Sequence, residues 1–244
     1  MWLAFIISAF IGLVAGRAIV AEASAHRRNL PDRWWDPLCE ACDTSLNVLM
    51  TRCRSEKHHQ AAVSWLTPLV TAALFGAVSL AVPSFAVLPA YLVFSGTMVL
   101  LTLTDLDTKL IPNRILGPAT ILASGLLIVG GFLAGTRSAL LWAAVGGATY
   151  FGVMFLLALV ARGGLGFGDV KMSFLIGVFA GYLSVGHVIV AGVGAFLLGG
   201  VVALGLLVTR RSSRKDAIPF GPFMTVAGLI AIVLGDAIIT WYLR

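Results

Sequence analysis

Long apolar stretches, separated by a few short polar segments, constrain the fold of this chain more than any other feature of its sequence. A membrane-spanning helix needs about 20 predominantly apolar residues, and the sequence divides into eight apolar stretches, of which the sixth is the shortest. Only 11% of the 244 residues are charged, whereas soluble domains carry about 25%. A membrane β-barrel would instead show short segments of alternating polarity. The sequence therefore predicts an all-α polytopic membrane protein with about eight transmembrane helices. The expected spans are residues 2–21, 63–82, 85–104, 115–134, 139–161, 170–182, 185–208 and 220–243.

Basic residues gather on one side of this predicted topology. The polar segments after spans one, three, five and seven share a side. Counting Arg17 and Lys171 at the span ends on that side, 15 of the 17 Lys and Arg residues fall there, all but Arg137 and Arg244. Because cytoplasmic loops carry the excess of Lys and Arg, we expect these segments to be cytoplasmic and both termini to lie on the other side. The net charge of +6 then suits a topology signal and anionic lipid head groups rather than nucleic acid.

The chain divides into three predicted regions. Residues 1–21 are the first transmembrane helix, residues 22–62 a polar cytoplasmic segment after it, and residues 63–244 the membrane core. At roughly 40 residues the polar segment is too small to hold a fold by itself, so it needs a metal or docking against the core.

Two carboxylates are expected to meet at the cytoplasmic ends of spans. Asp105 follows the third span, and Asp169 lies in the stretch Gly-Phe-Gly-Asp-Val-Lys before the sixth. When two carboxylates lie close together, one retains a proton. The ionised partner can then activate a water against a peptide carbonyl, and the protonated partner can donate a proton. The glycines before Asp169 are expected to let the backbone unwind at the membrane boundary. In the alternative interpretation, Asp169 and Lys171 are solvated residues that mark the end of a span.

The first aspartate also has a structural interpretation. Asp105 then ends a helix near Lys109 and Arg114, and Asp107 and Lys109 belong to a solvated loop. Pro112 would start the next helix, as proline often does.

Three sequence blocks, in this order, resemble the type IV prepilin peptidases, which are membrane aspartyl proteases with a G-x-G-D signature. The blocks are Asp105 with Ile-Pro-Asn at 111–113, Gly-Phe-Gly-Asp-Val-Lys at 166–171, and Ile-Pro-Phe-Gly-Pro-Phe at 218–223. The resemblance covers about Phe94 to the C-terminus. It implies that Asp105 and Asp169 are the catalytic aspartates, with Asp107 as the runner-up to Asp105. It implies supporting or substrate-binding roles for Gly166, Gly168, Lys171, Pro112, Asn113, Asp107, Pro219 and Gly221.

The resemblance also implies an activity. Members of this family cleave the short basic leader of type IV prepilins or pseudopilins, typically after a glycine and just before the hydrophobic helix. The implied location is the plasma membrane of a prokaryote, with the active site on the cytoplasmic face. The expected partners are prepilin or pseudopilin substrates and the lipid bilayer, and no nucleic acid. Proteolysis by two aspartates needs no cofactor.

Three cysteines lie in the polar segment, and their odd number argues against a disulfide framework. Bifunctional members of the family carry two C-x-x-C pairs in their first cytoplasmic loop, where four thiolates bind zinc. Cys39 and Cys42 form one such pair here, but the second begins at Cys53 and has Glu56 where the last cysteine would stand.

A zinc site would need a fourth ligand, which His58 or His59 could supply as part of a Cys₃His set. The alternative is a metal-free loop with reduced thiols. In the family this segment accompanies N-methylation of the new N-terminus with S-adenosylmethionine. The departure from two C-x-x-C pairs leaves both zinc binding and methyl transfer open.

The same residues are compatible with other functions. A transporter or channel could use Asp105 and Asp169 as an ion or proton relay, but it predicts acids near the bilayer midplane and an internal repeat, and the sequence has neither. A presenilin-like protease would place its first aspartate deeper in a span. The third alternative is a non-catalytic assembly partner in the membrane. Near the outer face, His187 and Asp236 are expected to be solvated or paired. Close helix packing is expected at Gly146, Gly147, Gly192, Gly194, Gly199 and Gly200.

Overall fold

The computed structural model describes residues 2–27, 63–161, 165–209 and 219–244. These residues form eight α-helices and contain no strand, which confirms the predicted fold class. Six of the helices are long and apolar enough to cross a membrane, and the apolar part of α2 is slightly shorter. The chain is a multi-pass membrane protein. The helices are α1 (Trp2–Arg27), α2 (Val63–Ala81), α3 (Leu88–Thr108), α4 (Asn113–Leu133), α5 (Arg137–Val160), α6 (Phe167–Leu183), α7 (Val185–Val208) and α8 (Gly221–Tyr242).

The end of α3 differs from the prediction. The helix continues to Thr108, about one turn beyond the expected end of the third span. Lys109 then adopts a left-handed conformation, with φ of 54°, and donates its N–H to the carbonyl of Asp105 over 2.8 Å. This bond satisfies one carbonyl of the last turn, which otherwise has no partner inside the helix. Asp105 and Asp107 therefore both lie on α3, and the predicted loop position of Asp107 is wrong.

The start of α6 is also earlier than predicted. Gly166 is extended, and the helix begins at Phe167, three residues before the expected span. Asp169 therefore lies in the first helical turn. Of the glycines at which unwinding was expected, Gly166 is extended and Gly168 is helical, whereas Gly163 and Gly164 lie outside the described residues. At its other end, the extended Ser184 separates α6 from α7, which confirms the predicted break between the sixth and seventh spans.

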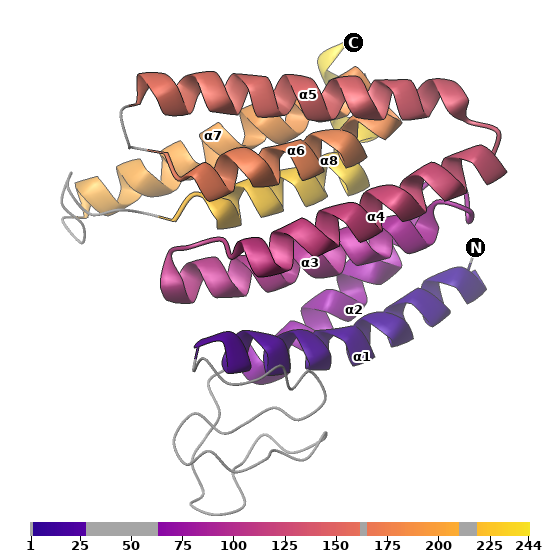
Figure 1. Cartoon of the computed structure of the whole chain (residues 1–244), viewed down its shortest axis with the longest axis horizontal. Coiled ribbons are helices and arrows are strands. Elements are labelled where there is room, and N and C mark those ends of the chain that lie inside the picture. Colours follow the sequence, from indigo (N-terminus) through magenta and orange to yellow (C-terminus); the bar gives the residue numbers. More distant parts are fainter. Residues whose placement is uncertain (1, 28–62, 162–164, 210–218) are drawn as a thin grey trace, which may run out of the picture.

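The helices form two groups that meet in the middle of the bundle (Figure 1). α1 to α4 pack on one side and α5 to α8 on the other, and α3 contacts α8 between them. Aromatic side chains link α3 to α6 in the same region. The Tyr91 hydroxyl donates to the carbonyl of Phe179 over 2.8 Å, and the ring of Phe94 stacks on that of Phe179 at 4.5 Å. This buried contact fixes α3 relative to α6, and both helices carry a candidate aspartate.

Glycines allow α5 and α6 to approach each other closely. A Cβ atom added at Gly177 would lie 2.5 Å from the carbonyl oxygen of Gly146, and one added at Gly147 would lie 2.6 Å from a methyl of Val178. The predicted packing role is confirmed for Gly146 and Gly147. It is wrong for Gly200, where an added Cβ atom would meet no atom of the described residues within 4 Å.

Replacing Gly177 by alanine is expected to lower the stability of the protein. The added methyl group would meet backbone of α5, which cannot rotate aside as a side chain can, and overpacking of this kind costs about 1–3 kcal/mol. Thermal unfolding in detergent should therefore show a lower midpoint. Gly152→Ala on α5 is the control, because an added Cβ atom has open space there. Equal midpoints for the two variants would contradict the packing described.

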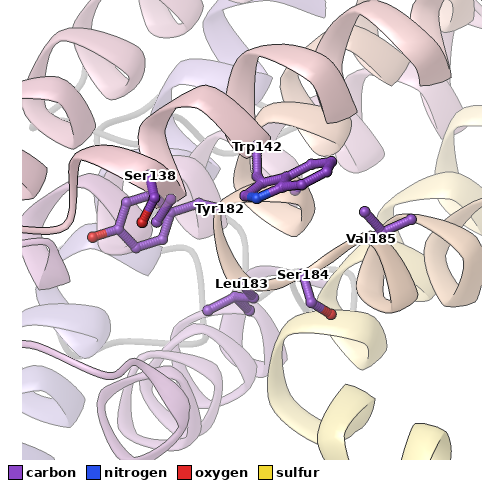
Figure 2. Close-up of a pocket in the computed structure, with 8 residues that line it drawn as sticks. Ser138, Trp142, Tyr182, Leu183, Ser184 and Val185 are labelled. Carbon is purple, nitrogen blue, oxygen red and sulfur yellow. The ribbon is translucent and has the colours of Figure 1, made fainter.

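The end of the bundle opposite Asp169 carries a pocket of about 420 Å³ between α5, α6 and α7 (Figure 2). Ser184 lines it, and its hydroxyl lies 2.7 Å from Nδ1 of His187. Nε2 of His187 lies 3.6 Å from Asp236, so the expected pairing of these two residues is confirmed. The Ser184 hydroxyl also accepts from the backbone N–H of His187, which is the contact of a helix N-cap. The contacts among Ser184, His187 and Asp236 are therefore explained by their structural role at the start of α7. The pocket is lined by Ser138, Ala139, Trp142, Gly181, Tyr182, Leu183, Ser184 and Val185.

Candidate active site

Asp105 is a buried carboxylate near the end of α3, with 4% of its surface exposed. The backbone amide of Gly221, the first residue of α8, interacts with this carboxylate. The two groups are so close that a Cβ atom added at Gly221 would lie 2.6 Å from Oδ2 of Asp105. That oxygen is buried and has no partner with hydrogen-bond geometry among the described residues. Buried polar atoms without partners are rare in folded proteins and often mark functional sites.

Asp169 is also buried, with 8% of its surface exposed. It is the third residue of α6, and its carboxylate interacts with the backbone N–H of Gly166, the N-cap residue. An acid at this position commonly reaches back to the N-cap. Asp169 also lies close enough to Asp105 for the two carboxylates to interact electrostatically.

Ile111 joins the three sequence blocks around these aspartates. A Cβ atom added at Gly168 would lie 2.8 Å from Cβ of Ile111, and one added at Gly221 would lie 3.5 Å from its Cδ1 atom. The Ile-Pro-Asn block therefore contacts both the glycine stretch before α6 and the start of α8. Pro219 is half-buried two residues before α8.

Lys171 and Asn113 connect the starts of α6 and α4. The Lys171 ammonium donates to Oδ1 of Asn113 over 3.0 Å and lies 5.0 Å from the ring centre of Phe167. Pro112 precedes α4 in an extended conformation, as its N-cap residue. Asp107, in contrast, is exposed at the end of α3. The structure thus gathers the residues named from the sequence blocks, but it leaves Asp107 at the surface.

One polar residue beside this site was missed by the sequence analysis. Tyr150 lies on α5, with 4% of its surface exposed, and its hydroxyl is buried without a hydrogen-bond partner among the described residues. It lies close enough to Asp169 to interact with its charge. In the sequence Tyr150 is one aromatic residue among many in an apolar stretch, so no local signal distinguishes it.

The proposed metal ligands Cys39, Cys42, Cys53 and His58 lie outside the described residues. Within the residues that the structure describes, no cluster of three or more His, Cys, Asp or Glu side chains could hold a metal ion. The described site contributes two interacting carboxylates. Such a pair can share a proton, activate a water and protonate a leaving group.

Comparisons with known proteins give a consistent assignment. Residues 92–205 match the model of the type IV leader peptidase family. Proteins named prepilin leader peptidase/N-methyltransferase are similar to this chain. The one from Aeromonas hydrophila is 32% identical over 199 residues, covering 80% of this chain and 66% of the relative. The one from Bacillus subtilis (strain 168) is 31% identical over 203 residues, covering 79% of this chain and 75% of the relative.

The chain thus spans 66% of the length of the Aeromonas relative and three quarters of the Bacillus one. No solved structure gives a significant match. The matched family model includes Asp105 and Asp169 with their surrounding sequence blocks, and ends before α8. On the match to the Bacillus protein over most of both chains, this chain belongs to the type IV leader peptidase family.

Proposed function

We propose that this chain is a membrane-embedded aspartyl endopeptidase that cleaves the leader of type IV prepilins or pseudopilins. The observation that carries the proposal is the pair of buried, electrostatically interacting carboxylates of Asp105 and Asp169. They come from different helices, α3 and α6, whose ends that carry the aspartates lie at the same end of the bundle (Figure 1). The names of the similar proteins support the same activity.

In the proposed reaction, the two aspartates share one proton and hold the attacking water between them. The ionised carboxylate takes a proton from the water as it attacks the peptide carbonyl, and the protonated one donates a proton to the carbonyl oxygen or the leaving amine. Because such a pair titrates jointly, the shared proton belongs to neither aspartate alone. The amides of Gly221 and Gly166 face Asp105 and Asp169 respectively, which supports a fixed orientation of both carboxylates.

The proposed location is the plasma membrane of a prokaryote, with the site on the cytoplasmic face. The distribution of basic residues supports this, since 15 of 17 fall in the segments on the side of Asp105 and Asp169. A cytoplasmic site can reach a leader that has not crossed the membrane. The relay function of a transporter is less well supported, because both aspartates lie at helix ends rather than near the middle of a span.

Methyl transfer is a separate proposal. The names of the similar proteins include N-methyltransferase, and that activity would require S-adenosylmethionine. Zinc binding by the polar segment at residues 22–62 is likewise separate, since the proteolytic step uses neither group. Elemental analysis of the purified protein, compared with that of the Cys39→Ser variant, tests whether the polar segment binds zinc.

The experiment that tests the main proposal is a cleavage assay with purified components. The protein is mixed with a full-length prepilin in detergent, and the product is sized and its new N-terminus determined by mass spectrometry. The expected result is one cut that removes the basic leader immediately before the hydrophobic helix. The same spectrum shows whether a methyl group has been added. An intact prepilin, with the folded protein present, would contradict the peptidase assignment.

Tyr150→Phe is expected to slow cleavage without unfolding the protein. The ring stays in place, but the buried hydroxyl, which is unpartnered among the described residues and interacts with the charge of Asp169, is lost. We propose that this hydroxyl donates to a charged group of the site during the reaction, and a hydrogen bond of that kind contributes about 1.5–3 kcal/mol. We therefore expect kcat to fall about tenfold to a hundredfold with KM nearly unchanged. The control is Tyr182→Phe, which removes a hydroxyl that contacts Thr136 at the other end of α6. Equal kcat values for Tyr150→Phe and the unmodified protein would show that the Tyr150 hydroxyl has no role in cleavage.

A further inference from the structure

A groove of about 780 Å³ lies between α4, α5 and α6 and opens to the outside of the bundle. α4 and α5 are joined by a short turn at one end of the bundle and separate towards the other, where α6 lies between them (Figure 1). The groove is lined mainly by apolar groups, and its polar lining is confined to a few side chains. Its residues are Asn113, Leu116, Gly117, Thr120, Ile121, Ala148, Phe151, Lys171 and Phe174.

The polar mouth of the groove, formed by Lys171 and Asn113, lies at the start of α6, the helix that carries Asp169. Lys171 lies at this mouth, two residues after Asp169, and is held by Asn113. Asn113 follows Ile111, which contacts the backbone at Gly168 and Gly221. The groove therefore starts at the helix turn that carries Asp169, although Asp169 itself does not line it.

The walls of the groove suit a helix. Gly117 has open space where a side chain would be, and such small residues let the backbones of membrane helices approach closely. Ile121 is 77% exposed and Phe174 is 37% exposed, so apolar side chains face outward on both sides of the groove. A bound apolar helix would cover both.

We propose that this groove holds the apolar helix of the substrate, with the cytoplasmic end of that helix at Lys171 and Asn113. The inference rests on the proposed peptidase function and adds the position of the substrate to it. A membrane helix that must present the bond just before it to Asp169 has to lie against the bundle near α6, and this groove begins two residues from Asp169.

The geometry of α6 then determines how the substrate reaches the aspartates. Successive residues of an α-helix are about 100° apart, so Asp169 and Lys171 lie on nearly opposite sides of α6. The substrate must therefore cross the N-terminal end of α6 before it enters the groove. A helix is about 10–12 Å across, so three or four extended residues suffice at about 3.3 Å each. This crossing passes Gly166, where an added Cβ atom would lie 3.2 Å from Oδ2 of Asp169 and would begin to cover the carboxylate.

Photo-crosslinking tests the position of the substrate helix. A photoreactive amino acid is placed at Ile121, which lines the groove, or at Leu122, which is 56% exposed, points about 100° further around α4 and does not line the groove. Both are made in full-length Asp169→Asn protein, so that a full-length prepilin is bound but not cut. We expect crosslinks to the apolar helix of the prepilin from position 121 and only background from position 122. Equal yields, or crosslinks to lipid alone from position 121, would overturn the proposal.

Filling the groove gives a second, independent test. Gly117→Trp places a large ring in the open space, and Leu122→Trp is the control. For Gly117→Trp we expect the KM for a full-length prepilin to rise at least about tenfold, as for the loss of a central interface contact. Cleavage of a short peptide that contains the leader and cut site but lacks the apolar helix should not change. Equal KM values for prepilin would overturn the groove assignment while leaving the peptidase intact. Failure of the unmodified protein to cut either substrate would instead contradict the proposed function.

Discussion

Replacing either buried aspartate by asparagine is expected to abolish prepilin cleavage while the protein remains folded. Asparagine keeps the size of the side chain but can neither take up the proton of the attacking water nor donate one as a carboxylic acid does. Loss of general acid–base catalysis lowers a reaction rate by a factor of about 10²–10⁴. The cleavage rates of Asp105→Asn and Asp169→Asn should both fall by at least this factor. The measurement is the initial rate of leader removal in detergent, with the thermal unfolding midpoint recorded for each variant.

Asp107→Asn is the matched control, because it makes the same change two residues away on the same helix. Asp107 is exposed whereas Asp105 is buried against Gly221, so the control should cleave at nearly the normal rate. The double variant of Asp105 and Asp169 should be hardly slower than either single one, since residues that act as a unit are not additive. If Asp107→Asn were inactive and Asp105→Asn active, the pair would have to be reassigned.

Gly221→Ala is expected to reduce cleavage about a hundredfold, the loss that a displacement of about 1 Å can cause in an active site. The added Cβ atom would lie 2.6 Å from Oδ2 of Asp105, which is closer than such atoms approach. Because the opposing atom is the end of a side chain, the carboxylate can rotate away and the backbone need not move. The expected result is a fall in kcat with little change in the unfolding midpoint.

The opposite result is expected for Gly177→Ala, where the opposing atom is backbone and stability falls. The change from glycine to alanine thus affects function at Gly221 and stability at Gly177. Gly200→Ala on α7, with open space at the added atom, should alter neither rate nor midpoint. Full activity of Gly221→Ala would show that the start of α8 does not hold Asp105 in place.

The sequence predicted the all-α membrane fold and the break at Ser184, since both depend on patterns local to the chain. It also named both aspartates and the block that contains Gly221. It did not predict where α3 ends, because Lys109 closes its last turn through a left-handed conformation that most residue types avoid. Nor did it find Tyr150, whose position beside Asp169 depends on how closely α5 and α6 approach.

The contact between the two helix groups has a consequence for the synthesis and membrane insertion of the chain. Asp105 belongs to the group formed by α1 to α4, and Asp169 belongs to the group formed by α5 to α8. The first group is synthesised first and carries one carboxylate without its partner. The pair exists only after the second group has been inserted and has docked through Phe179 onto Tyr91 and Phe94. An incompletely synthesised chain in the membrane therefore has no competent pair, so the proposed proteolysis can begin only once both groups are assembled.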